Sequence, residues 1–457
     1  MAKTAKQNRG KTLRRVKKGI AKASKRFVKN VKQLSMRGRN IFGRAKKMKI
    51  WGGKYKGKTV VLLIIDPQND FADSPETLDK LKSNEGLPVV GAVKDFTNII
   101  TMLNGDMGKI IDEIHISLDS HNDTHIGHVG FWKRSDEVDV EPNVVFKVVQ
   151  NANGTKKIVD KHKYEAAVKT IEEYQAQNEH LQEGAIKSEE MEAAVETIKN
   201  IEDYQAKKPK LQKWAIKYIE KMAENGKPDP LIWNKHCIKG SEGWKVYQLL
   251  WKAIITWRDN GGGTRKLYVH EKGGNDLCEM YSIMQAEVTY ENLLNDNDFN
   301  EEEKTEIIST FDPEDKKKIE SIDGGDLVNP PLPPFKAVTG DELNVNPIPN
   351  LVTNFNQPLY NALCGTPDNQ KILLICGEAK SHCVKSSATD IVEKMETTGH
   401  NPDHVYILND AMSSVQLPKD PTRNALFAGF SDEFIQNMSE KKANITTTED
   451  VFKNYFK

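Results

Sequence analysis

The sequence is poor in cysteine and has no long apolar run. Its cysteines are odd in number, irregularly spaced and form no Cys-X-X-Cys pair: Cys237, Cys278, Cys364, Cys376 and Cys383. This usage excludes a disulfide framework and a cysteine-based zinc site, and it favours an intracellular, reducing compartment. No stretch approaches the about 20 apolar residues of a membrane-spanning helix, and no apolar signal region follows the start. We therefore expect a soluble protein.

Acidic side chains are absent before Asp66, whereas 22 Lys and Arg occur there. The rest of the chain carries 44 basic and 65 acidic side chains, so a basic arm, residues 1–57, precedes an acidic body. Apolar residues recur in the arm every three or four positions, which predicts a basic amphipathic helix, with a disordered tail as the alternative. Nucleic acid, an anionic membrane and a larger assembly are all suitable partners. The cytoplasm is the favoured location, and the nucleus, the mitochondrion and a nucleoprotein or virion assembly stay open.

Five apolar runs follow the arm, and stretches with helical periodicity separate them. They read "KTVVLLIIDPQNDF", "IDEIHISLDSH", "TRKLYVHEKGG", "KILLICGEA" and "HVYILNDAM". Buried strands alternating with helices predict an α/β fold with a doubly wound, mostly parallel sheet flanked by helices. In such sheets, functional groups gather beyond the carboxyl ends of the strands. Five polar or reactive residues lie at such ends: Asp66, Asp119, Lys272, Cys383 and Asp410.

Two insertions interrupt this alternation. Residues 160–224 are charged and helical, and they contain a duplication. "YEAAVKTIEEYQAQNEHLQEGAIK" from Tyr164 reappears as "MEAAVETIKNIEDYQAKKPKLQKWAIK" from Met191. Residues 290–350 are acidic and then Pro-rich, which predicts a surface excursion with little regular structure.

A carboxylate and several imidazoles form the first chemical constellation. Asp119 and His121 are two residues apart at a strand end, His125 and His128 follow, and His236 lies in "IWNKHCIKGSEG". Asp119, His121 and one distant histidine would suit a zinc-like or iron-like ion and leave positions open for water or substrate. Surface histidines without a metal are the alternative.

A thiol with two charged neighbours forms the second constellation. Cys383 stands where a buried strand passes into a helix, a place where backbone N–H groups favour negative charge. Asp66 would accept its proton, and Lys272 would supply a cationic neighbour. A buried core cysteine and a surface lysine are the alternative interpretation.

Five segments occur in the order found in a known family. "LLIIDPQNDF", "SLDSHNDTHIGH", "IWNKHCIKGSEG", "EKGG…EMYS" and "GEAKSHCVKSSATDI" resemble nicotinamidases of the isochorismatase-like cysteine hydrolase superfamily, especially its longer nicotinamidase-related amidases. The resemblance covers roughly residues 58–288 and 350–415. It implies that residues 58–457 form an isochorismatase-like hydrolase domain that takes part in NAD metabolism. The implied reaction converts nicotinamide to nicotinate and ammonia through a cysteine thioester.

The resemblance also assigns roles. It implies a catalytic triad of Asp66, Lys272 and Cys383, and an oxyanion hole from the N–H groups of Ala379 and Cys383 after a cis Glu378–Ala379 peptide. It places a divalent metal, zinc with iron or manganese as alternatives, on Asp119, His121 and His236, with His125 as a further candidate. It places substrate-binding aromatics at Phe71, Trp233 and Tyr281. Asn234 and Lys235 replace the prolines usual in the second metal segment, which puts the rigidity of that loop in question.

Two other functions remain open from the sequence. One is a related cysteine amidase that acts on another small amide; the metal residues argue for nicotinamide. The other is a nucleic-acid-associated or structural assembly protein with a hydrolase fold, which the basic arm favours.

Overall fold

The computed structural model describes residues 57–151, 153–177, 189–294, 298–311, 335–343, 346, 353–417 and 420–455. Residues 1–57 with 454–457 form one unit, and Lys58–Lys453 form another, which is the one described below. The helix predicted in the basic arm lies outside the described residues, as does the first Pro-rich stretch, which falls within 312–334. No helix in the described part of the chain combines the length and apolarity needed to cross a membrane.

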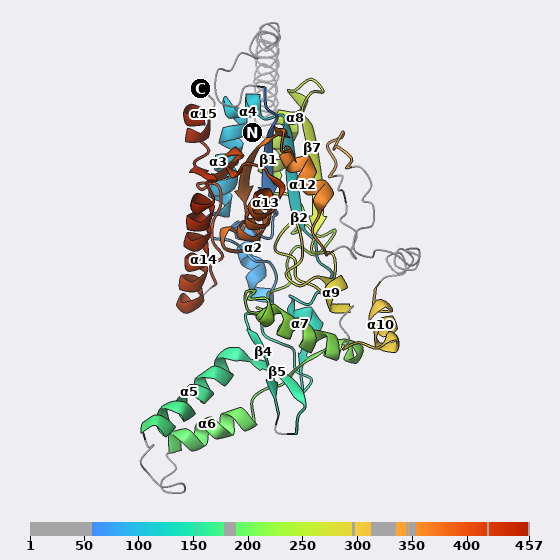
Figure 1. The fold of residues 1–457 in the computed structure, drawn as a ribbon, viewed down its shortest axis with the longest axis vertical. Coiled ribbons are helices and arrows are strands. Elements are labelled where there is room, and N and C mark those ends of the chain that lie inside the picture. Colours follow the sequence, from blue (N-terminus) through green and yellow to red (C-terminus); the bar gives the residue numbers. More distant parts are fainter. Residues whose placement is uncertain are drawn as a thin grey trace, which may run out of the picture. The chain divides into compact units, whose positions relative to one another are not determined.

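A six-stranded parallel sheet forms the centre of this unit (Figure 1). In spatial order its strands are β12 (Asn444–Thr446), β11 (Val405–Leu408), β10 (Ile372–Gly377), β1 (Val60–Ile65), β2 (Glu113–Asp119) and β7 (Lys266–Lys272). Every neighbouring pair is parallel. The five predicted strands and the α/β class are confirmed. The short edge strand β12 was not predicted.

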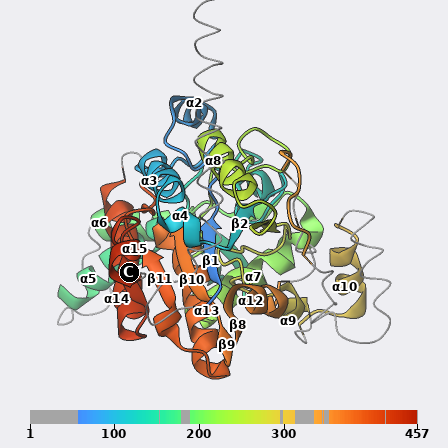
Figure 2. The same cartoon turned by 90° about the horizontal axis from the view of Figure 1, so that it is seen from above.

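Helices cover both faces of the sheet. α3 (Ala92–Asn104) and α8 (Gln248–Asp259) lie on one face, and α12 (Gln357–Cys364) and α13 (Lys385–Thr398) lie on the other (Figure 2). Every residue of β1 and β10 is buried as a result, which explains their continuous apolar sequences. The other elements of this layer structure are α2 (Pro75–Lys80), α4 (Met107–Ile110), β8 (Gly365–Thr366), β9 (Asn369–Gln370), α14 (Pro421–Glu440) and α15 (Asp450–Tyr455).

A second, antiparallel sheet was not predicted. Its strands, in order, are β3 (Trp132–Arg134), β6 (Tyr204–Ala206), β5 (Lys156–Asp160) and β4 (Phe146–Gln150). Helix α7 (Gln212–Glu224) packs on it, and a separate aromatic-rich core fills the space between them. The strands have only three to five residues, too few for an alternating pattern to stand out. Residues 160–224 were predicted to be helical. The insertion also contains a strand, because β6 lies within it.

The duplicated sequence adopts two different structures. The first copy, from Tyr164, forms α5 (Lys161–Gln177), and the second copy, from Met191, begins in α6 (Glu189–Lys199). These two helices contact each other and extend away from the two sheets (Figure 1). Tyr-Gln-Ala at 174–176 is helical in α5, whereas the same tripeptide forms strand β6 at 204–206. Only the second copy pairs with β5, so tertiary contacts decide its conformation.

Removing the helical pair α5–α6 is expected to leave a folded protein. Ile158 of β5 pairs antiparallel with Tyr204 of β6, so a short Gly/Ser turn can join the two strands in place of residues 162–200. The deletion exposes little, because most described side chains of α5 and α6 face solvent and only Ala167 and Ala194 among them are below 9% exposure. Circular dichroism, a thermal melt and an activity assay should match the full chain. Insoluble protein would show that the pair belongs to the core.

The acidic insertion is more regular than predicted over its first part. It contains α9 (Tyr290–Leu294) and α10 (Glu301–Ile308), and the latter begins with a capping box between Asn300 and Glu303. Tyr290 and Ile307 are buried in the aromatic-rich core. Further on, Val338 and Asn346 donate backbone hydrogen bonds to β7. The described parts of the insertion therefore pack on the body and along the edge strand.

Candidate active site

Four of the five strand-end residues converge. Asp119 and Lys272 end the adjacent strands β2 and β7 and lie opposite each other in the register. Asp66 directly follows β1, and Cys383 lies on a single π-helical turn, Lys380–Val384, between β10 and α13. Asp410 does not join them: its carboxylate accepts hydrogen bonds from the backbone N–H and hydroxyl of Thr448.

Lys272 is the centre of the group. Its Nζ lies 3.0 Å from Asp66 Oδ2, 2.9 Å from Asp119 Oδ1 and 3.6 Å from Cys383 Sγ, and it also donates to the Met280 carbonyl at 3.1 Å. The side chain is 1% exposed, so the alternative of a surface lysine is wrong. A buried ammonium needs such partners because desolvation of an unpaired charge is very costly.

Asp66 is held in place by a residue that the sequence did not single out. The Ser117 hydroxyl donates to Asp66 Oδ1 at 2.5 Å, and the Asp66 N–H donates back to the same hydroxyl at 2.9 Å. The backbone of Asp66 has a φ of 44°, uncommon for a residue with a side chain and frequent at functional sites. Oδ2 faces Lys272 as an ion pair but accepts no well-aligned hydrogen bond from the described groups, so a lone pair is available for a proton.

Burial dominates the electrostatics of this group. It raises the pKa of the Cys383 thiol well above its usual value, although Lys272 opposes the shift, and Asp66 and Asp119 add to it. Burial also raises the pKa of Asp66, with Lys272 again opposing. For Lys272, burial would lower the pKa, but the carboxylates of Asp119 and Asp66 raise it well above its usual value. These pKa directions favour a neutral Cys383 thiol beside a charged Lys272 ammonium.

Two histidines turn one ring nitrogen each toward Asp119. His121 Nδ1 donates to the Gly273 carbonyl at 3.2 Å, which leaves Nε2 2.8 Å from Asp119 Oδ2. His236 Nδ1 donates to the Asn234 carbonyl at 2.8 Å, which leaves Nε2 3.4 Å from the same oxygen. Metal-binding histidines usually donate one ring N–H to a group such as a backbone carbonyl and bind the metal with the other ring nitrogen.

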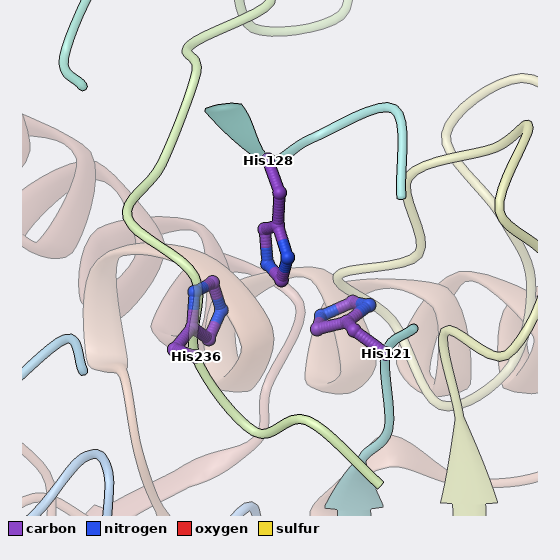
Figure 3. A group of neighbouring side chains, drawn as sticks. All are labelled: His121, His128 and His236. Atoms are coloured by element: carbon purple, nitrogen blue, oxygen red, sulfur yellow. The ribbon is translucent and has the colours of Figure 1, made fainter. Parts of the chain in front are cut away.

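His128 and His125 differ sharply in their hydrogen bonds. His128 is 1% exposed, and in the described structure neither of its ring nitrogens has a hydrogen-bond partner. Its ring lies 4.6 Å from those of His121 and His236, and the three point toward one another (Figure 3). His125 uses both nitrogens: Nε2 donates to the Cys278 carbonyl at 3.1 Å, and Nδ1 accepts from the Gly127 N–H at 3.1 Å.

Two groups of buried side chains have the spacing for a metal ion. One is His121, His128 and His236, and the other is His121, His125 and Glu279. The His128 ring is surrounded by those of His121, His125 and His236, and neither of its nitrogens has a hydrogen-bond partner among the described residues, a state that costs free energy unless a ligand is bound. The residues present therefore fit a metal ion.

The predicted aromatic residues lie beside these groups. The Phe71 ring is 5.5 Å from that of His236. Trp233 Nε1 donates to the Tyr281 hydroxyl at 3.1 Å, and both rings lie 5.3 Å from that of His382. His382 directly precedes Cys383 and was not singled out from the sequence. All three predicted aromatics are less than 10% exposed; Tyr281 shares a buried core with Cys383, and Phe71 lies beside the metal-binding candidate His236.

The loop at the second metal segment is fixed although it lacks prolines. The Asn234 side chain donates to the Gly86 carbonyl at 3.2 Å, and the Gly86 N–H donates to the Lys235 carbonyl at 2.7 Å. Lys235 also forms an ion pair with Asp123 at 3.2 Å. These contacts replace the rigidity that prolines would give.

The Glu378–Ala379 peptide is cis, as the resemblance implied. The segment 411–415 holds the loop around it by backbone hydrogen bonds. Gly377 N–H donates to the Ala411 carbonyl at 2.9 Å, and Lys380 N–H donates to the Ser413 carbonyl at 2.8 Å. Ala379 is thus positioned between β10 and the turn that carries Cys383.

Comparison with solved structures finds nicotinamidases and related amidases at low sequence identity and low TM-score. The yeast nicotinamidase matches with a TM-score of 0.39 and 12% identity, over 85% of this chain and 99% of its own. A nicotinamidase/pyrazinamidase from Acinetobacter baumanii matches with 0.37 and 12%, over 87% and 99%. N-carbamoylsarcosine amidase from Thermoplasma acidophilum matches with 0.29 and 10%, over 86% and 97%. No protein-family model and no curated sequence matches the chain.

Proposed function

We propose that the protein is a metal-dependent cysteine amidohydrolase that converts nicotinamide to nicotinate and ammonia. The observation that carries the proposal is the position of Lys272 Nζ, within 3.0 Å of two buried carboxylates and 3.6 Å from Cys383 Sγ. A structural protein has no need of a buried thiol, acid and ammonium at one point beside three histidines. Perturbed ionisable groups gathered at a strand end are typical of catalytic sites.

In the first half of the reaction, Asp66 accepts the Cys383 thiol proton as sulfur attacks the amide carbon. The lone pair on Asp66 Oδ2 is available for that proton, and Lys272 stabilises the developing thiolate. The Ala379 and Cys383 N–H groups would bind the oxyanion. Asp66 then passes the proton to the leaving nitrogen, the C–N bond breaks, and ammonia and a thioester are formed.

In the second half, water attacks the thioester carbon. Asp66, again ionised, accepts a proton from the water and returns it to the Cys383 sulfur as the C–S bond breaks. The second water proton passes to solvent as nicotinate is released. Burial keeps the pKa of Cys383 high, which makes the departing thiolate a ready proton acceptor at this step. The same two residues therefore serve both halves of the cycle.

Asp119, His121 and His236 would hold the metal, with His128 in preference to His125 as the fourth side chain. This preference rests on the hydrogen bonds. Both ring nitrogens of His125 are already hydrogen-bonded, whereas neither ring nitrogen of His128 has a partner in the described structure. A bound divalent ion would supply a Lewis-acid contact for the pyridine nitrogen. Zinc suits the nitrogen-rich set best, and iron or manganese is the alternative. Phe71, Trp233 and Tyr281 would enclose the ring.

A panel of small amides tests the proposal. Nicotinamide should release ammonia readily, whereas benzamide, which has the same shape without the ring nitrogen, should react at least about 100-fold more slowly because it leaves the metal contact unmade. Ammonia release is measured with purified protein before and after treatment with a chelator. Equal rates for the two amides would point to a related amidase with another substrate. Absence of hydrolysis across the panel would contradict the enzyme assignment.

A further inference from the structure

Two buried carboxyl groups lie beside the loop that carries Ala379. Glu378 follows β10 and is 0% exposed, and Asp95 lies in the first turn of α3 and is 5% exposed. Ser413 joins them: its hydroxyl donates to Asp95 Oδ2 at 2.5 Å, and its N–H donates to Glu378 Oε2 at 3.1 Å. Neither carboxyl group belongs to the catalytic group around Lys272, and neither contacts the histidines.

Cations act on Asp95, but none is among the charges that act most strongly on Glu378. The charges acting most strongly on Glu378 are those of Asp95 and Asp73, and those on Asp95 are Lys94 and Asp410. The half-buried Lys380 interacts electrostatically with Asp95, and the buried Cys376 thiol does so with both carboxyl groups. Two adjacent ionised carboxylates cannot be buried together at acceptable cost, as in other carboxyl pairs that share one proton.

The hydrogen bonds show where a proton is missing. Glu378 Oε1 is buried and, with both groups ionised, has no donor among the described residues. A proton on Glu378, directed to Asp95, would satisfy both groups. Burial raises the pKa of both groups, and the interaction between the two side chains raises that of Glu378 further while opposing the rise at Asp95. Together with the unpartnered Glu378 Oε1, this places the proton on Glu378.

We propose that Glu378 is a neutral acid that donates a hydrogen bond to ionised Asp95, and that this acid pair positions the Ala379 N–H for the reaction. The role given to the loop rests on the proposed function, whereas the protonation of the acid pair does not. Glu378 accepts a hydrogen bond from the Ser413 N–H, and the Ser413 hydroxyl donates to Asp95 of α3, so the pair joins the loop to two neighbouring elements. It touches no reacting atom and acts as a positioning residue.

The pair predicts a definite pH dependence. Burial raises the pKa of Asp95 to about 6, so one proton remains on the pair above that pH. Burial raises the pKa of Glu378 well above the value it has in the unfolded chain. The folded state therefore binds more protons than the unfolded state, and stability falls as pH rises. For one proton, the unfolding equilibrium constant rises by up to about tenfold per pH unit.

The test compares the full chain with Glu378→Gln, Glu378→Leu and a control, Glu113→Gln, between pH 6.5 and 9. Glutamine keeps a donor for Asp95 and an acceptor for Ser413 but cannot ionise. The melting temperature of Glu378→Gln should therefore rise relative to wild type as pH increases. Glu113 has a pKa of about 2 and stays ionised throughout, so its glutamine variant should keep a constant offset from wild type.

Activity tests the positioning role. Glu378→Leu should lower kcat at least about tenfold with little change in KM or metal content, because a lost buried hydrogen bond shifts the loop and leaves the binding residues in place. Glu378→Gln should restore kcat near pH 7. If Glu378→Leu does not fold, the melting comparison of wild type with Glu378→Gln still decides the protonation.

Each result has one meaning. Parallel melting profiles for wild type and Glu378→Gln would overturn the proton assignment, and a wild-type kcat in Glu378→Leu would overturn the positioning role. If the wild-type protein hydrolyses no amide, the proposed function fails by itself. The rate of Cys383 alkylation by iodoacetamide, measured in the same variants, then replaces kcat as the readout of loop position.

Discussion

Replacing Cys383 with alanine is expected to reduce amide hydrolysis to below about 1% of wild type, because no other group can form the acyl intermediate. Asp66→Asn should be nearly as damaging. Burial keeps the pKa of Cys383 well above its usual value, so the thiol must lose its proton during the attack, and an amide cannot accept it. Both variants should fold and bind metal, since each removes or changes few atoms.

Cys364→Ala provides the matched control. Cys364 is also a buried thiol whose pKa burial raises, but it lies in the last turn of α12 and is not among the groups that contact Lys272. Its loss removes the same atoms and should leave turnover close to wild type. Steady-state rates, thermal melts and metal content are compared across the three variants. More than a few per cent of activity in Cys383→Ala would show that the reaction is not covalent through this cysteine.

The sequence predicted the central sheet well because each of its main strands is buried on both faces. β1, β10 and β11 are continuous apolar runs, β2 and β7 interleave apolar with polar residues, and a polar or reactive residue marks the end of each. The edge strand β12 and the antiparallel sheet have three to five residues per strand, and their pairing depends on contacts far apart in sequence. The two Tyr-Gln-Ala segments show the limit directly, since identical residues form a helix and a strand.

Some residues of the candidate site could be predicted from the sequence, and others could not. Asp66, Asp119, Lys272 and Cys383 could be found because strand ends meet at one edge of a parallel sheet. Ser117 could have been suspected, because it lies two residues before Asp119 on the same face of β2. Glu378 and Asp95 could not, since 283 residues separate them in the printed sequence and nothing in either segment marks a shared proton.

Replacing one of the buried histidines is the second change for which we expect a large effect. His128→Ala is expected to weaken metal binding at least about 100-fold, because His128 has both ring nitrogens free in the described structure and directed among His121 and His236. His121→Ala should behave in the same way. His125→Ala should keep its metal and instead lose stability, because it breaks the bonds to the Cys278 carbonyl and the Gly127 N–H.

Metal content by mass spectrometry and a thermal melt, measured on each variant, separate the two outcomes. The resemblance offered His125 as the further candidate ligand, whereas the hydrogen bonds favour His128, so the two single variants discriminate directly. Added zinc should raise the melting temperature of wild type and His125→Ala, because a ligand that binds the folded state stabilises it, and should have little effect on His128→Ala. Full metal occupancy in His128→Ala together with loss in His125→Ala would instead place the ion on His121, His125 and Glu279, the other group with suitable spacing.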